Sequence, residues 1–69
     1  MPLSLCSEGT AYTVKRVGGT AAVRQHLNEL GFNVGAPVTV VSALDGNIIV
    51  RVKESRLAID RAMATRIIV

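Results

Sequence analysis

The chain has 69 residues, which is one small domain near the lower size limit for folding without a partner. Hydrophobic residues make up 49% of it, aromatic residues only 3% and charged residues 19%, with a net charge of +3. This balance excludes a disordered chain, and no apolar run approaches the roughly 18 residues of a membrane-spanning helix. The N-terminus has no basic segment followed by an apolar stretch, so a secretory signal is not expected.

The sequence lacks the two features that commonly stabilise very small domains, which are disulfide bonds and structural metal sites. The single cysteine, Cys6, cannot form an internal disulfide, and no Cys/His cluster offers a structural metal site. We therefore expect a cytoplasmic protein that is held together by packing alone. Its core must come from ten valines, five isoleucines and six leucines, a mixture that favours strands over long helices.

The first periodic segment covers residues 11–17 and predicts a strand. Tyr12 and Val14 share one face of this strand, and polar side chains occupy the other face. Gly18 and Gly19 follow directly and interrupt the alternation, so the strand is expected to end before them.

The sequence predicts one clear helix, over residues 21–30. Thr20 can cap its N-terminus, and Gly31 follows its last turn, where a left-handed residue commonly ends a helix. The apolar stripe recurs at i, i+4 and i+7 and comprises Val23, Leu27 and Leu30. A helix of about ten residues is too short to be stable alone, so this stripe is expected to dock onto strands.

Residues 37–44 and 47–53 predict a hairpin around Asp45-Gly46, a strong signal for a two-residue turn. With that turn, the expected cross-strand pairs on the core face are Ala43–Ile48, Val41–Val50 and Thr39–Val52. This register leaves three apolar residues on the opposite face, namely Val38, Val40 and Leu44. Such a strand is either bent and shared by two sheet surfaces, or carries a β-bulge that shifts its register.

The last third of the chain consists of short segments. Residues 53–55 predict a turn that leads into a strand over 56–60. Residues 61–65 predict a single helical turn. The apolar residues 66–69 predict a last strand that is paired into the sheet. Together the elements predict a mainly β fold. It is a small, partly open five-stranded β-barrel with one inserted helix and one short helical turn.

Candidate catalytic and metal-binding residues are scarce. His26 is the only histidine and lies beside the apolar stripe, where we expect its ring to pack against the sheet. Nothing in the sequence brings Cys6 to His26, as a nucleophile–base pair or a metal site would require. The five carboxylates show no catalytic pairing, and Gly18-Gly19-Thr20 lacks the lysine of a phosphate-binding loop. We expect no enzyme, no metal site and no cofactor.

Among the basic residues, Arg51, Lys53 and Arg56 can line up across adjacent strands, and Lys15 and Arg16 lie on another strand. Small β-barrels bind nucleic acid through such faces, but they use exposed aromatic residues for stacking. Only Tyr12 and Phe32 are available, and both lie on apolar faces. An ordinary solvated face, or a surface for an acidic protein, therefore fits the pattern better than nucleic-acid binding.

The chain as a whole resembles the FeoA family, small cytoplasmic proteins of bacterial ferrous iron transport. The joint order and spacing of many short motifs carry this resemblance over nearly the whole chain. The most specific motif is Leu30-Gly31-Phe32-x-x-Gly35, at the exit of the helix. The others are Pro2-Leu3, Glu8-Gly9, Tyr12-Thr13-Val14, Gly18-Gly19, Arg24-Gln25-His26-Leu27, Val38-x-Val40, Gly46-Asn47, Ser55-Arg56-Leu57-Ala58-Ile59, Ala62-Met63-Ala64 and Ile67-Ile68-Val69. One departure is Ser55, which stands where glycine is frequent in the family.

The resemblance implies an SH3-like barrel with an inserted helix. It also implies an accessory or regulatory role in ferrous iron uptake, through binding to the cytoplasmic G-domain of the FeoB permease. The alternatives are an SH3-like module of a metal-dependent regulator and a nucleic-acid-binding small barrel. A direct Fe(II) chaperone is the weakest hypothesis, because ligands are lacking.

For a protein-binding role, we expect a groove between the inserted helix and the strands of the barrel. One side would be an outward helix face, and the other the hairpin tip with the basic residues beyond it. The candidate partner-binding residues are Arg24, Asn28, Gly46, Asn47, Arg51 and Lys53. Neither nucleic-acid binding nor membrane insertion is expected. Self-association is left open, since the apolar C-terminus and an exposed Val38 or Val40 would support it.

Overall fold

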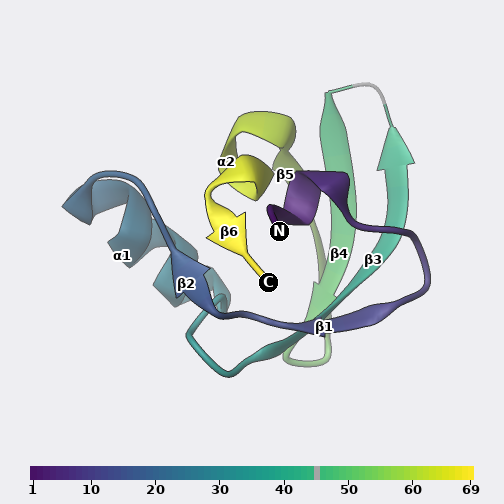
Figure 1. The fold of residues 1–69 in the computed structure, drawn as a ribbon, viewed down its shortest axis with the longest axis horizontal. Coiled ribbons are helices and arrows are strands. Elements are labelled where there is room, and N and C mark those ends of the chain that lie inside the picture. Colours follow the sequence, from purple (N-terminus) through teal and green to yellow (C-terminus); the bar gives the residue numbers. More distant parts are fainter. Residues whose placement is uncertain (45) are drawn as a thin grey trace.

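A four-stranded antiparallel sheet forms the larger layer of the fold, with strand order β1-β3-β4-β5 (Figure 1). A two-stranded sheet of β2 and β6 forms a second, smaller layer. This computed structural model describes residues 1–44 and 46–69. Its elements are η1 (Leu3–Leu5), β1 (Ala11–Thr13), β2 (Arg16–Val17), α1 (Ala21–Leu30), β3 (Pro37–Leu44), β4 (Asn47–Val52), β5 (Ser55–Asp60), α2 (Arg61–Thr65) and β6 (Ile67–Ile68).

The predicted mainly β fold, its inserted helix and its short helical turn are confirmed. Both helices have the predicted bounds, but the described residues form six strands where five were predicted. The extra strand arises because the predicted strand over residues 11–17 divides at Val14. The Val14 N–H donates to the Ala36 carbonyl at 2.9 Å, whereas the next N–H, of Lys15, donates to Ile68 at 2.7 Å. The chain therefore passes from one sheet to the other at this point.

The predicted hairpin is present, and a β-bulge in β3 sets its register. Ala43 pairs with Ile48 as predicted, but the pairs Val41–Val50 and Thr39–Val52 are wrong. The register shifts between Val40 and Ser42, so that Val40 pairs with Val50. Beyond the bulge Val38 pairs with Val52 and Thr39 with Arg51. The bulge is thus the correct one of the two alternatives that the sequence left open.

The bulge brings the apolar residues of β3 and β4 to the same face of the sheet. Val38 and Val40 are each 1% exposed, so neither offers an apolar surface for self-association. Val41, which occupies the bulge, is only half-buried. The buried core comprises Leu3, Val14, Leu27, Phe32, Ala36, Val38, Val40, Ile48, Val50, Val52, Ile59, Ala64, Ile67 and Val69.

Both ends of the chain join the same layer. The amino group of Met1 donates to the Val69 carbonyl at 2.9 Å, and the Val69 N–H donates back to the Met1 carbonyl at 2.8 Å. Pro2 forms an isolated bridge with Ile68. The predicted pairing of the C-terminal apolar segment into a sheet is therefore confirmed, because β6 pairs with β2 on its other side.

The two hairpin turns differ in their residues. At the β3–β4 turn, Leu44 pairs with Asn47 and Gly46 has a φ of 78°, while the other predicted turn residue, Asp45, lies outside the described residues. At the β4–β5 turn, Lys53 and Glu54 both adopt positive φ, of 49° and 64°. Ser55, predicted as part of that turn, already belongs to β5. Side chains with a Cβ are disfavoured in this conformation, which hairpin turns usually give to Asn and Gly.

We predict that Val40→Ala destabilises the protein by about 2 kcal/mol, because it removes buried methyl groups and leaves a cavity. Val41→Ala, one residue away in the bulge, should cost less than half of this. Urea unfolding of the two variants measures the difference. A larger loss for Val41→Ala would show that the bulge lies elsewhere in the strand.

We predict that Glu54→Gly raises the free energy of unfolding by about 1 kcal/mol, since it relieves a positive φ at a residue with a Cβ. The matched control is Glu29→Gly in α1, which should lower stability by about 1 kcal/mol because glycine is unfavourable inside a helix. Thermal unfolding followed by circular dichroism compares the two. Destabilisation by both variants would contradict the strain assigned to this turn.

Candidate protein-binding surface

The helix α1 presents the first part of the candidate site. Its N-terminus is capped by Thr20, whose hydroxyl accepts a hydrogen bond from the Val23 N–H at 3.3 Å, and its C-terminus by Gly31 with a φ of 111°. The Phe32 N–H then returns to the Leu27 carbonyl at 3.0 Å. Leu27 and Phe32 are both fully buried, so they fix the helix on the core and leave its other face in solvent.

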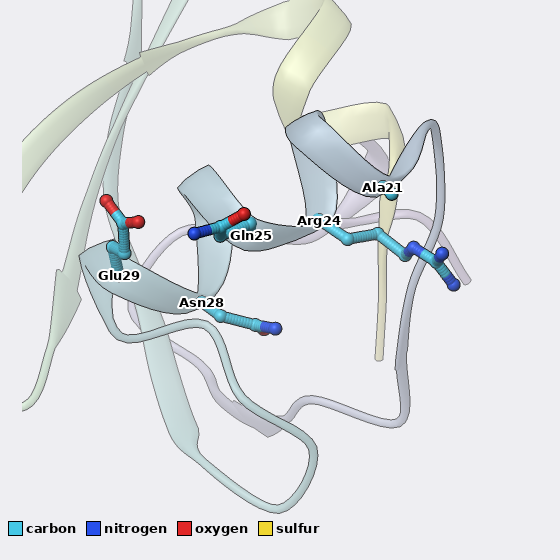
Figure 2. A pocket seen from close by; sticks show the side chains of 5 residues that line it. All are labelled: Ala21, Arg24, Gln25, Asn28 and Glu29. Carbon is cyan, nitrogen blue, oxygen red and sulfur yellow. The ribbon is translucent and has the colours of Figure 1, made fainter.

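A shallow hollow lies on this outward face of α1, and Figure 2 shows the side chains around it. Arg24 and Asn28 extend from the helix toward the same side, as their i, i+4 spacing predicts (Figure 2). All the residues that line the hollow belong to α1, namely Ala21, Arg24, Gln25, Asn28 and Glu29. The hollow is therefore not the predicted groove between helix and strands, because none of the strand residues that the structure describes lines it.

The outer face of the β4–β5 hairpin presents the second part. Arg51 pairs with Thr39 on one side and with Arg56 on the other, and directly opposite residues project from the same face of a sheet. All three side chains of this basic surface, Arg51, Lys53 and Arg56, are solvent-exposed. Arg56 was absent from the predicted site residues, although hairpin pairing around Lys53-Glu54 places it opposite Arg51.

Lys53 links the basic surface to α1. A Cβ placed on Gly31 would lie 3.3 Å from the Lys53 Cδ and 3.5 Å from a methyl group of Val52. The aliphatic part of Lys53 therefore runs beside the C-terminal end of α1, where a positive charge is favourable near the helix carbonyls. Gly31 leaves room for this approach, and its positive φ also suits glycine.

The predicted hairpin tip lies away from the basic surface. Gly46 and Asn47 are at the opposite end of β4 from Lys53, about 20 Å along a strand of six residues. The Gly46 carbonyl accepts a hydrogen bond from the Arg61 N–H at 3.1 Å, and Asn47 pairs with Asp60. The tip therefore borders the start of α2. The structure brings Arg51 and Lys53 together, places Arg24 and Asn28 on the helix, and separates Gly46 and Asn47 from both groups.

Comparison with known proteins identifies the family. The FeoA domain model matches residues 1–69, the whole chain. The chain belongs to the FeoA family. It is 32% identical over 68 residues to a protein of Methanocaldococcus jannaschii named Fe(2+) transport protein A, which covers 99% of this chain and 83% of that protein.

Two solved structures share the fold of this FeoA-family chain, and one of them is described as an SH3 domain protein. The FeoA of Stenotrophomonas maltophilia, described as a procaryotic SH3 domain protein in complex with zinc, superposes with a TM-score of 0.85. It is 28% identical, and the match covers 99% of this chain and 87% of that one. A manganese-dependent transcriptional repressor superposes with a TM-score of 0.87 at 18% identity, over 97% of this chain and 39% of the repressor. The second likeness concerns the fold alone.

His26 and Cys6, the candidates for nucleophilic or metal-binding roles, lie on different elements: His26 belongs to α1, and Cys6 follows η1. His26 is exposed, so the expectation that its ring packs against the sheet is wrong; the buried part of α1 is narrow and contains only Leu27. Within residues 1–44 and 46–69, no group of three or more His, Cys, Asp and Glu side chains is arranged to hold a metal ion. The same residues contain no helix with the length and apolarity needed to cross a membrane.

Cys6 is half-buried near the N-terminus, and its Sγ lies 3.5 Å from the Pro2 carbonyl. Burial raises the pKa of the Cys6 thiol, while a hydrogen bond with Tyr12 and the positive N-terminus oppose this effect. The folded protein therefore holds the thiol proton more tightly than the unfolded chain does. Because the thiolate is the reactive form, this environment makes Cys6 a poor nucleophile at neutral pH.

We predict that iodoacetamide alkylates Cys6 several-fold more slowly in the folded protein than in the same chain unfolded in urea at the same pH. The raised pKa also means that the stability from this group is fully present below the thiol pKa of the unfolded chain and is lost as the pH rises through the higher pKa of the folded protein. The Cys6→Ser variant is the control and should lack this alkaline loss. Faster alkylation in the folded state would contradict the assigned environment.

Proposed function

We propose that this chain is a non-catalytic accessory protein of ferrous iron uptake that binds the cytoplasmic G-domain of a FeoB-type permease. Membership of the FeoA family supports a role in ferrous iron uptake. So does the name of the M. jannaschii relative, an Fe(2+) transport protein. The description of the S. maltophilia structure likewise concerns activation of bacterial ferrous iron transport.

The observation that carries the protein-binding mechanism is the basic surface of Arg51, Lys53 and Arg56. Arg51 and Arg56 stand on the paired strands β4 and β5, and Lys53 in the turn between them. The inner residues of β4, Val50 and Val52, are fully buried. The backbone beneath the cations is therefore held in place by the core, so little order has to be gained on binding. A fixed cluster of positive charge attracts an acidic protein surface and orients it during the encounter.

The outward face of α1 would extend the same contact. The Lys53 side chain runs past the C-terminal end of α1, so this end of the helix adjoins the basic surface. Arg24 and Asn28 line the hollow farther along the helix and offer a charged group and an amide to a partner. In this proposal the hairpin tip at Gly46 and Asn47 plays no part in binding, because it lies at the far end of β4.

We predict that Arg51→Glu combined with Lys53→Glu weakens binding to the FeoB G-domain by about tenfold or more, equivalent to at least about 1.4 kcal/mol. Isothermal titration calorimetry at two salt concentrations measures the effect, and the double variant should lose most of the salt dependence of the wild type. The fold should be retained, because the new carboxylate at position 51 faces Arg56 and replaces a like-charged pair by an opposite one.

The matched control is Lys15→Glu combined with Arg16→Glu, which makes the same change in net charge at exposed positions beside β2. This control should bind as the wild type does. Equal affinity of all three proteins would reject the basic surface as the interface. An absence of binding by the wild type, with and without GTP, would reject the permease as the partner.

A further inference from the structure

We infer that the free edge of β5 is a docking site for a second copy of this chain. The second copy adds its own β5 as an antiparallel strand centred on Ala58, so that Arg56 of each copy faces Asp60 of the other. This dimer would form without the permease. Three features of β5 favour it: its position in the sheet, the direction of its backbone groups and the order of its charges.

β5 is the last strand of the larger sheet, and its single strand partner is β4. The other side of β3, by contrast, is covered along its length. β1 pairs with its first residues, the Gly9 N–H donates to the Val40 carbonyl at 2.8 Å, and the Ala43 N–H donates to the Glu8 carboxylate at 3.2 Å. Among the described residues, no strand or loop pairs in this way with the outer edge of β5.

The register of the β4–β5 hairpin shows which backbone groups face outward. Val52 pairs with Ser55 around a two-residue turn, and such a closing pair exchanges both of its hydrogen bonds. In an antiparallel pair the hydrogen-bonded residues alternate, so Leu57 and Ile59 also bond to β4. The backbone N–H and C=O groups of Arg56 and Ala58 therefore point away from β4, toward the open edge, where a new strand can pair with them.

The charges of β5 select one self-complementary register. When two β5 strands pair about a twofold axis at Ala58, Arg56 lies opposite Asp60 of the second copy. Among registers that join the outward groups of both strands, this is the one that places opposite charges face to face. A register centred on Arg56 would oppose two arginines, and one centred on Asp60 would oppose two carboxylates. Ala58, which is small and exposed, sits at the centre of the selected register.

The second copy would also place a negative charge beside the two arginines that face each other on β4 and β5. Arg51 and Arg56 are directly opposite one another, and like charges in that position are destabilising. Asp60 of the second copy would extend the same cross-strand row and place a carboxylate beside this pair. Asp60 is held ready for the contact, because its Oδ1 accepts a hydrogen bond from the Met63 N–H at 2.7 Å and leaves the second oxygen for a guanidinium.

The pairing would give a weak, closed dimer. A contact of about five residues per strand is small compared with the roughly 1,200 Å² that a stable interface buries in total. Because the contact is isologous, each copy uses the same edge, and the assembly ends at two chains. We therefore expect a dimer that forms and dissociates with protein concentration.

Two measurements on the wild-type chain test the dimer. Sedimentation velocity should show the mass rising from one chain toward two as the concentration is raised from micromolar to millimolar. Over the same range, hydrogen exchange followed by NMR should slow for the amides of Arg56 and Ala58, the groups that gain partners at the edge. A mass of one chain throughout, or exchange rates at both amides that do not depend on concentration, would overturn the inference.

Two variants locate the contact, with a matched control. Ala58→Pro removes the central N–H without breaking a bond to β4, so the chain should fold and the dimer should be lost. Arg56→Asp should also abolish the dimer, whereas Arg16→Asp, with the same change in net charge on β2, should leave it intact. Circular dichroism verifies the fold of each variant. Dimers of wild-type strength in both edge variants, or equal loss in the control, would refute this register.

Discussion

The β-bulge in β3 is the constraint on which the rest of this structure depends. β3 is the strand that joins β1 to β4, so its register fixes how the remaining strands of the larger sheet face the core. By inserting Val41 as an unpaired residue, the bulge turns Val38 and Val40 inward to meet Val50 and Val52. Because side chains alternate with a period of two, a shift of one residue exchanges the buried and exposed faces of a strand.

The outer face of the sheet is set by the alternation of side chains along β4. With Val50 and Val52 inside, the alternation places Arg51 outside, and the β4–β5 pairing puts Arg56 beside it. The bulge therefore completes the aliphatic core from the side of β3, whereas the alternation of β4 and its pairing with β5 gather positive charge on the outer surface. The core holds the charged strands in fixed positions, which is the property that a recognition surface needs.

The fold compensates for its small size by joining segments that are far apart in the sequence. Met1 and Val69 exchange two backbone hydrogen bonds, and the chain passes between the two sheets at Val14 and Lys15. Such contacts close the layers around the core without a disulfide, the one cysteine being free. Among the described residues, no strand pairs with the outer edge of β5, so a further strand can be added there.

Local sequence signals alone predicted the elements that depend on neighbouring residues. The helix over 21–30 with its Thr20 cap and Gly31 end, the turn at 61–65 and the hairpin pair Ala43–Ile48 all follow from spacing within one turn or one hairpin. The resemblance of the whole chain to one family could also be recognised from the sequence, because it depends on the order of motifs.

Only the tertiary structure decided the position of the bulge, the division of the first strand between two sheets and the grouping of the candidate site. Those features depend on how distant segments share one core: both faces of β3 are apolar in sequence, and packing against β4 and the rest of the core selects the buried one. The separation of Asn47 from Lys53, by contrast, already follows from the strand predicted over residues 47–53, because an extended strand places its two ends far apart.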